Sequence, residues 1–207
     1  MFAPVLIAYS TRTGSTREVA EAVADVLRQT RLTVDVARVR DVNSLDRYST
    51  VILGTPIYLG ALPKEIHEFL SRFRAPLSRR LSWVFALGPV LGTRDEFGLA
   101  ANQTGNELAL FPWFQPVEVK IMGGRFNAKR MPFPFNLMRH LVPSQFKGVP
   151  NADLRNWNDI RAWATGVSWR IEPAASKFAE PQFAPQEMPA AEPEFAPEYR
   201  LIRLSSS

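Results

Sequence analysis

Six hydroxylated side chains and one glycine are concentrated in residues 9–16, which read YSTRTGST. Hydroxyl groups donate hydrogen bonds without adding charge, and a glycine lets a ligand approach the backbone closely. A helical pattern begins at Ser15, and the N-terminus of a helix offers unpaired N–H groups and a partial positive charge. The stretch therefore predicts an uncharged cradle for a phosphate group. The residues of this predicted cradle are Ser10, Thr11, Arg12, Thr13, Gly14, Ser15 and Thr16.

The cradle differs from the two common nucleotide-binding loops. It lacks the G-x-x-x-x-G-K-[ST] spacing with its lysine, and it lacks G-x-G-x-x-G, so neither a triphosphate nor a dinucleotide is the expected ligand. A simpler interpretation is a capping box in which Ser15 and Glu18 close the helix and the other hydroxyls are surplus. An ordinary cap needs only one hydroxyl, so the number of hydroxyls favours a phosphate site.

Other catalytic chemistries find little support in the residue types. The chain contains no cysteine, which excludes disulfides, thiol catalysis and cysteine-ligated metals. Its two histidines, His67 and His140, stand in no metal-ligand spacing and are expected on the surface or on a helix face. There is no G-x-S-x-G nucleophile motif. Redox chemistry would need a bound organic cofactor, so we expect no catalytic side chain and no metal ligand.

Strand and helix patterns alternate along residues 1–170. Short apolar runs predict strands, and apolar residues at a spacing of three or four predict helices. The alternation predicts a doubly wound, five-stranded parallel sheet in a three-layer α/β/α sandwich. The expected strands are 3–10, 32–39, 49–56, 82–88 and 117–123. The expected helices are 15–29, 63–73 with Pro63 in its first turn, 102–110 after a long polar loop, and 153–169.

Two further loops follow central strands of the predicted sheet. Ligands of doubly wound sheets bind at the carboxyl ends of the strands, where these loops and the hydroxyl-rich loop meet. Residues 54–61 read GTPIYLGA and residues 87–98 read LGPVLGTRDEFG. The candidate ligand-binding residues in these loops are Thr55, Pro56, Ile57, Tyr58, Gly60, Gly88 and Pro89.

Charge is distributed unevenly along the chain. The net charge is +5, and because residues 171–207 contribute −3, residues 1–170 carry +8. Residues 119–152 hold six basic residues and no acid. Such a surface attracts phosphates, carboxylates or acidic lipid, or is a solvated basic face without a partner. Residues 124–150 are expected to form a basic, aromatic insert with a short helix at 134–141, and residues 171–207 a Pro/Glu-rich, largely irregular tail.

The hydroxyl-rich loop resembles the phosphate loop of flavodoxins, the family that binds FMN. The residues that match the family pattern are Tyr9, Thr11, Gly14, Thr16 and Ala20. The resemblance implies a flavodoxin-like fold with FMN as cofactor, its phosphate in the first loop and its ring between the other two. It also implies that Tyr58 stacks on the ring and that the backbone near Gly60 flips when the flavin is protonated.

A second resemblance is to the flavodoxin-type, menaquinone-dependent protoporphyrinogen dehydrogenases. It rests on residues 6–27 and on the basic insert that follows KIMGGRF (120–126), and it covers residues 1–170. It implies a quinone-linked oxidoreductase in which the flavin performs the chemistry. Arg125, Lys129 and Arg130 would then hold substrate carboxylates. The aromatic residues of the insert would contact the macrocycle or a membrane surface, or else cover one edge of the core.

Three function classes remain open at this stage: an FMN-dependent oxidoreductase, an electron carrier without its own substrate, and a non-catalytic binding protein. The basic charge of residues 1–170 counts against a carrier, because carriers of this family are typically acidic. The expected partners are a small-molecule or quinone electron partner and an anionic membrane surface contacted peripherally, with no nucleic acid. A homo-oligomer is also compatible with the sequence. The short apolar run Phe2–Ala8 and the absence of a long apolar segment predict a cytoplasmic protein, with a peripheral position at the inner face of the membrane as a variant.

Overall fold

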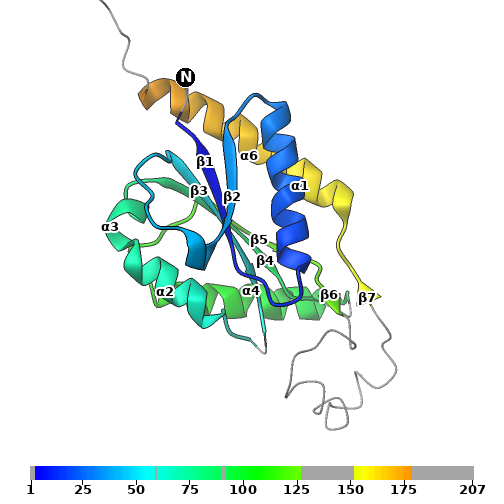
Figure 1. Ribbon diagram of the computed structural model, residues 1–207. Helices are drawn as coiled ribbons and strands as arrows, with labels where there is room; N and C mark the ends of the chain where they lie inside the picture. The colour runs from blue at the N-terminus through cyan, green and yellow to red at the C-terminus, as the bar shows by residue number, and fades with distance from the viewer. Residues whose placement is uncertain (1–2, 59, 90–91, 127–151, 179–207) are drawn as a thin grey trace, which may run out of the picture.

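The computed structural model describes residues 3–58, 60–89, 92–126 and 152–178. A sheet of five parallel strands lies at its centre (Figure 1), in the order β2-β1-β3-β4-β5. The strands are β1 (Val5–Tyr9), β2 (Val34–Arg38), β3 (Thr50–Pro56), β4 (Leu81–Leu87) and β5 (Glu118–Met122). The predicted doubly wound sheet is thereby confirmed, with each strand within two residues of its expected bounds.

Helices cover both faces of the sheet (Figure 1). On one face lie α1 (Ser15–Gln29) and α6 (Trp157–Phe178), which pack beside each other over the sheet. On the other face lie α2 (Lys64–Arg72), α4 (Arg94–Ala109), the short α3 (Arg74–Leu77) and the 3-10 helix η1 (Val39–Asp41). Each face has its own apolar core, as expected for a parallel sheet buried on both sides.

The strands β3 and β4 are joined by an unusually close contact at their centre. Gly54 and Phe85 stand opposite each other in the register, and a Cβ on Gly54 would lie 2.3 Å from Cζ of Phe85. The Phe85 ring therefore fills the space beside a residue that has no side chain. The same ring meets Trp163 of α6 edge to face at 6.0 Å. The absence of a side chain at Gly54 therefore lets the Phe85 ring pack against both β3 and helix α6.

Helix α4 differs from the sequence-based expectation. It begins at Arg94, eight residues before the expected start, so the loop after β4 is shorter than predicted. Its buried positions are Ala100, Thr104 and Leu108, and this small and partly polar stripe gave little helical periodicity. On the same face of the sheet, α2 begins at Lys64, with Pro63 as its N-cap residue and not inside its first turn.

Helix α6 begins later and ends later than expected. It starts at Trp157 and reaches Phe178, so the predicted irregular tail from residue 171 is wrong for its first eight residues. Ile171 is buried and continues the apolar stripe of Ile160, Ala164 and Val167. Packing of Ile171 on the core extends the helix beyond the change in composition. Residues 179–207 lie outside the described residues.

A two-stranded antiparallel stem follows β5. Its strands are β6 (Arg125–Phe126) and β7 (Ala152–Asp153), and the chain between them, residues 127–151, lies outside the described residues together with the short helix expected at 134–141. The described residues on either side of 127–151 are thus paired with each other. Within the described ranges, no helix combines the length and apolar character needed to cross a bilayer.

Candidate functional site

The carboxyl ends of β1, β3, β4 and β5 lie side by side, and backbone hydrogen bonds hold the loops that leave them. The Ser10 N–H donates to the Gly54 carbonyl at 2.9 Å, and the Ile57 N–H donates to the Leu87 carbonyl at 2.8 Å. The Gly88 N–H donates to the carbonyl of β5 residue Met122 at 3.4 Å. The three loops that the sequence singled out are therefore brought together at one edge of the sheet, as predicted.

The loop after β1 leads into α1 through a glycine. Gly14 is the N-cap residue, with φ of 93° in the left-handed region that favours glycine. Its N–H donates to Oγ1 of Thr11 at 3.0 Å, which fixes the turn. No side chain caps the helix, so the predicted capping box of Ser15 and Glu18 is wrong. The N–H groups of the first turn are consequently left without a partner inside the helix.

Thr16 stands in this uncapped first turn. Its side chain is fully buried, and its Oγ1 has no hydrogen-bond partner. A buried hydroxyl without a partner costs about 1–3 kcal/mol, so such groups need an explanation. A bound anion at the N-terminus of α1 would supply the missing acceptor. This arrangement fits the predicted phosphate cradle, whereas surplus capping residues would not leave the hydroxyl buried and unpaired.

The buried Ser10 is engaged elsewhere. Its hydroxyl donates a hydrogen bond to Oε1 of Glu65, in the first turn of α2. The proton of that hydroxyl is therefore committed to a carboxylate and not directed toward a ligand. Sequence reasoning did not identify Glu65, because an acidic residue in the first turn of a helix is an ordinary helix-dipole feature.

Tyr58 lies where the loop after β3 faces the loop after β1. The guanidinium carbon of Arg12 is 4.7 Å from the centre of the Tyr58 ring. Burial raises the pKa of Tyr58, against the lowering effect of the backbone hydrogen bond and charge of Arg12. The ring is thus neutral and half-buried, with a cationic group on one face. An aromatic face in this position is suited to stacking on a planar ligand, and the stacking of Tyr58 on a flavin ring stays a prediction.

Gly60 adopts the conformation for which a glycine is needed. Tyr58 and Ala61 exchange both backbone hydrogen bonds at 3.1 Å across a tight turn, and Gly60, the third residue of that turn, has φ of 85°. A Cβ on Gly60 would lie 2.8 Å from Nε2 of Gln103 on α4. The backbone at Gly60 therefore has a positive φ, and the side chain of Gln103 covers it closely.

The remaining predicted residues shape the other two loops. Thr55 is fully buried and its hydroxyl donates to the Pro56 carbonyl at 3.0 Å, so this hydroxyl is used inside the strand end. A Cβ on Gly88 would lie 3.3 Å from Cδ1 of Ile57, which shows how closely these loops pack. The Pro89 carbonyl accepts a hydrogen bond from the Gly124 N–H at 2.7 Å. Residues 59, 90 and 91 lie outside the described residues, and ligand contacts for all these positions stay predictions.

An ionic cluster lies beside the first turn of α1. Arg155, whose side chain is only 3% exposed, donates to Asp153 at 2.6 and 2.7 Å and to Glu18 at 2.7 Å. Arg125 pairs with both oxygens of Glu18 at 3.0 Å. Burial opposes ionisation of Glu18, but the hydrogen bonds and charges of Arg155 and Arg125 outweigh it and lower the pKa of Glu18. The hydrogen bond from Arg155 likewise lowers the pKa of Asp153.

Sequence reasoning missed this cluster, since it singled out Arg125 only as a substrate-binding residue and Glu18 only as half of a capping box. Its members are far apart in the chain, and no local pattern marks Arg155 as a buried arginine. The predicted role of Arg125 in holding a substrate carboxylate stays a prediction, and the structure shows that its guanidinium is already paired with Glu18. Lys129 and Arg130, predicted for the same role, lie outside the described residues.

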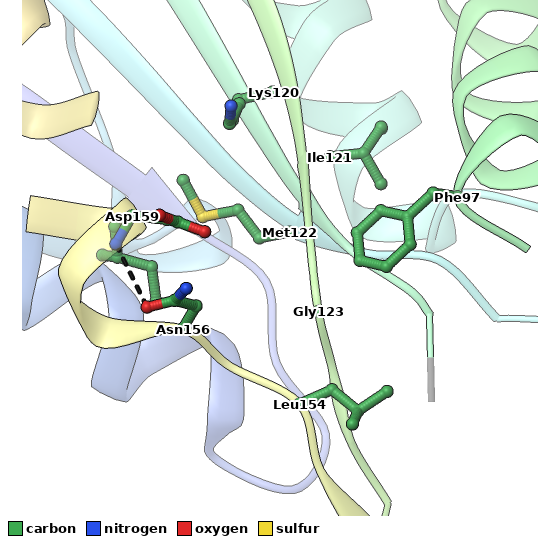
Figure 2. Close-up of a pocket in the computed structure, with 9 residues that line it drawn as sticks. Phe97, Lys120, Ile121, Met122, Gly123, Leu154, Asn156 and Asp159 are labelled. Carbon is green, nitrogen blue, oxygen red and sulfur yellow. Dashed lines mark hydrogen bonds between the residues drawn. The ribbon is translucent and has the colours of Figure 1, made fainter. Parts of the chain in front are cut away.

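A hollow of about 270 Å³ lies over the carboxyl end of the edge strand β5. Figure 2 shows Met122, Lys120 and Asp159 on one side of the strand and Phe97 and Ile121 on the other. Asn156 closes one end, where its Oδ1 accepts the Asp159 N–H at 3.3 Å. Its lining residues come from α4, from β5 with Gly123, and from residues 154–160, and none of them belongs to the loop after β1 or to the first turn of α1.

Metal chemistry has no assembled ligand set in the part of the chain that the structure describes. No group of three or more His, Asp or Glu side chains gathers there in a way that could hold a metal ion. His67 of α2 instead pairs with Glu107 of α4 at 2.8 Å, and Glu107 also accepts the Leu62 N–H at 3.1 Å. His67 therefore joins two helices on one face of the sheet.

The strand order β2-β1-β3-β4-β5, the hydroxyl-rich loop that turns at Gly14 and the two loops beside it are the architecture of a flavodoxin-type protein. Residues 6–142 match the family model described as a flavodoxin domain, which is more than half of the chain. The chain belongs to the flavodoxin family. A curated relative, protoporphyrinogen IX dehydrogenase (quinone) of Escherichia coli K12, is 24% identical over 127 residues, which are 60% of this chain and 70% of the relative.

Solved flavodoxins have the same fold. A flavodoxin from Streptococcus pneumoniae TIGR4 superimposes with a TM-score of 0.54 at 20% identity, covering 83% of this chain and 99% of that one. Oxidised Flavodoxin 2 from Bacillus cereus gives a TM-score of 0.51 at 16% identity, covering 83% and 99%. These similarities confirm the predicted fold. Membership of the family implies a flavin cofactor and flavin-type redox function, and the buried unpaired hydroxyl of Thr16 fits the phosphate end of such a group.

Proposed function

We propose that this chain is an FMN-dependent oxidoreductase of the protoporphyrinogen dehydrogenase type. The observation that supports FMN is the buried, unpartnered hydroxyl of Thr16 at a helix N-terminus that no side chain caps. A phosphate monoester would accept hydrogen bonds both from this hydroxyl and from the N–H groups of the first turn. Among flavins, FMN carries such a group at its end, whereas riboflavin carries none.

Each loop has its own task in the proposed complex. The loop after β1 binds the phosphate through Gly14, whose missing side chain lets the anion approach the backbone, and through Thr11, Thr13 and Thr16. The loop after β3 presents Tyr58 to the planar ring. The loop after β4, entered through Gly88, bounds the ring on the other side. When bound, the flavin supplies the transfer of hydride or electrons from a reduced substrate to an acceptor.

The reaction class is proposed from the relative in Escherichia coli, whose name describes a protoporphyrinogen IX dehydrogenase that uses a quinone. The charge of +8 on residues 1–170 suits a substrate that bears carboxylates. We therefore propose a porphyrinogen-like macrocycle as electron donor and a quinone as electron acceptor. No catalytic acid or base is required, because the chain's task is to bind, orient and exclude water around the flavin.

A second candidate is an electron carrier without its own substrate. It is favoured by the similarity in fold to solved flavodoxins, some of which superimpose over 99% of their length. It is disfavoured by the basic charge, which would repel the basic partners on which acidic carriers dock. Turnover separates the two, since a carrier exchanges electrons with proteins but does not oxidise a porphyrinogen.

The first experiment measures cofactor binding to the full-length protein. FMN and riboflavin are titrated separately into wild type, Thr16→Val and Thr16→Ser, with quenching of flavin fluorescence as the readout. We expect Thr16→Val to weaken FMN binding about tenfold, the equivalent of one lost hydrogen bond to a charged group, and to leave riboflavin unchanged. Thr16→Ser, which keeps the hydroxyl, should bind like wild type. Wild-type protein that does not bind FMN would overturn the proposal.

The second experiment tests the reaction. Loaded protein is mixed with protoporphyrinogen and a quinone, and the growth of porphyrin fluorescence is followed. We expect porphyrin to form only when both FMN and quinone are present. A protein that binds FMN and passes electrons to redox proteins, yet leaves protoporphyrinogen unchanged, is the carrier described above.

A further inference from the structure

The stem that closes the insert is fastened to the body of the domain at the phosphate loop. Its strands pair Arg125 with Asp153 and Phe126 with Ala152. The Leu154 N–H donates to the Gly124 carbonyl at 3.0 Å, directly below the stem. A Cβ on Gly123 would lie 2.1 Å from the Leu154 carbonyl oxygen, so the two chain segments approach as closely as a glycine permits.

Arg155 joins this stem to helix α1. It is the most deeply buried cation in the cluster, with 3% of its side chain exposed, and it lies 4.6 Å from the centre of the Trp157 ring. It binds Asp153 of the stem through two nitrogens and Glu18 of α1 through the third. A buried guanidinium is retained only when it is paired in this way, and removing a partner leaves an uncompensated charge.

Glu18 is the member of the cluster nearest to the proposed anion site. It stands in the first turn of α1, and its Oε1 is 4.0 Å from the position that a Cβ on Gly14 would occupy. A carboxylate in the first turn is attracted to the positive end of the helix, which is the place that a phosphate needs. Left unpaired, Glu18 would compete with and repel that phosphate. Arg155 and Arg125 instead take up both of its oxygens.

We infer that Arg155, assisted by Arg125, is a positioning residue of the cofactor site: it neutralises Glu18 and holds it against the insert stem, so that the N-terminus of α1 is open to a phosphate. This inference rests on the proposed function. The four charged groups sum to zero, which removes the repulsion without adding a competing ligand for the anion. The base of the insert and the phosphate loop are consequently coupled through one guanidinium.

The test separates electrostatic shielding from a merely structural role. FMN, riboflavin and inorganic phosphate are each titrated into wild type, Arg155→Gln, Glu18→Gln and the double variant, using the full-length protein. We expect Arg155→Gln to weaken FMN binding about tenfold, with riboflavin changed less than about threefold, because only FMN carries the repelled charge. Glu18→Gln alone should bind FMN at least as well as wild type, and adding it to Arg155→Gln should restore most of the affinity.

Salt provides a second readout. The loss of affinity in Arg155→Gln should shrink when ionic strength rises from about 0.02 to 0.5 M, because screening weakens repulsion between partly exposed charges. The matched control is Arg170→Gln, which breaks the 3.0 Å pair between Arg170 of α6 and Glu118 of β5 and should leave FMN binding unchanged. If Arg155→Gln does not fold, Arg125→Gln, whose side chain is 22% exposed, should show the same pattern at about threefold.

Two results would overturn the inference. Equal losses for FMN and riboflavin in Arg155→Gln would mean that the residue only maintains the fold, and failure of Glu18→Gln to restore FMN affinity would mean that the carboxylate is not the cause. Wild type that binds phosphate but not FMN would overturn the proposed function, and the same order of the four proteins in phosphate binding would then support the inference. Wild type that binds neither would overturn both.

Discussion

The guanidinium of Arg12 lies over the ring of Tyr58, 4.7 Å from its centre, so the loop after β1 touches the loop after β3. A cation–π contact at a partly exposed site contributes about 0.5–1 kcal/mol. We expect a double-mutant cycle with Arg12→Gln and Tyr58→Leu, measured by urea unfolding, to give a coupling free energy in this range. Replacing Tyr58 by Phe should keep most of the coupling. Additive effects of the two substitutions would contradict the contact.

The buried hydroxyl of Thr16 should reduce stability when no anion is bound. Valine has nearly the same shape and no hydroxyl, so Thr16→Val should raise the free energy of unfolding by about 1 kcal/mol in protein without cofactor or phosphate. The same substitution is expected to weaken FMN binding, so stability and affinity should change in opposite directions. Chemical unfolding of cofactor-free protein checks this, and a fall in stability would show that the hydroxyl is already hydrogen-bonded.

Two glycines, one in the loop after β3 and one inside α4, should respond oppositely to replacement by alanine. At Gly60, φ of 85° and the nearby Gln103 side chain disfavour a Cβ, so Gly60→Ala should lower the free energy of unfolding by about 1–2 kcal/mol. Gly98 lies inside α4 with nothing within 4 Å of its Cβ position. Gly98→Ala should therefore raise the free energy of unfolding by about 0.5–1 kcal/mol. Thermal unfolding of both variants, compared with wild type, is the measurement.

The contact between Gly54 and Phe85 predicts a specific rescue. A Cβ on Gly54 would overlap the Phe85 ring, and overpacking of a core costs about 1–3 kcal/mol. Gly54→Ala should therefore be strongly destabilised in urea unfolding. Phe85→Leu opens space at that point, so the double variant should be more stable than the sum of the two single changes predicts. A double variant with simply additive losses would argue against this packing.

Stability should fall on acidification through the cluster at the insert stem. The pKa values of Glu18 and Asp153 are lowered in the folded protein, so in the acid range the unfolded chain binds more protons than the folded one. The stabilisation that these two carboxylates give to the folded state is complete above the ordinary carboxyl pKa of about 4. It is lost as the pH falls through the lowered pKa values. Urea unfolding between about pH 6 and 3 should show a shallower fall in Glu18→Gln than in wild type. Equal slopes would count against a lowered pKa.

The strands and helix α1 were predicted correctly because their local sequence patterns agree with how they pack in the fold. All residues of β1 and β3 are buried, and their continuous apolar runs predicted strands of a parallel sheet. The bounds of α1 were predicted correctly because its apolar residues recur at helical spacing. The beginning of α4 was missed because, of its buried residues, Ala100 is small and Thr104 is polar, and the large apolar Leu108 comes only near the end of the helix.

Two segments have the residue spacing of a capping box, but only one of them forms a cap. Thr93 and Glu96 do cap α4: the Glu96 N–H donates to Thr93 Oγ1 at 3.2 Å, and Glu96 accepts the Gly92 N–H at 3.0 Å. Ser15 and Glu18 have the same spacing but form no cap. The difference is that Glu18 meets Arg125 and Arg155, which come from distant parts of the chain.

The sequence by itself determined the sheet, the helix that follows the hydroxyl-rich loop, and the residue types that suit a phosphate, because these depend on short-range periodicity and on side-chain chemistry. Tertiary structure alone decided that Thr16 is buried without a partner, that Ser10 is engaged by Glu65, and that Glu18 is paired with Arg155 and Arg125. Each of these depends on which groups from distant parts of the chain come close to the side chain in the fold, because hydrogen bonds and ion pairs act only over a few ångströms.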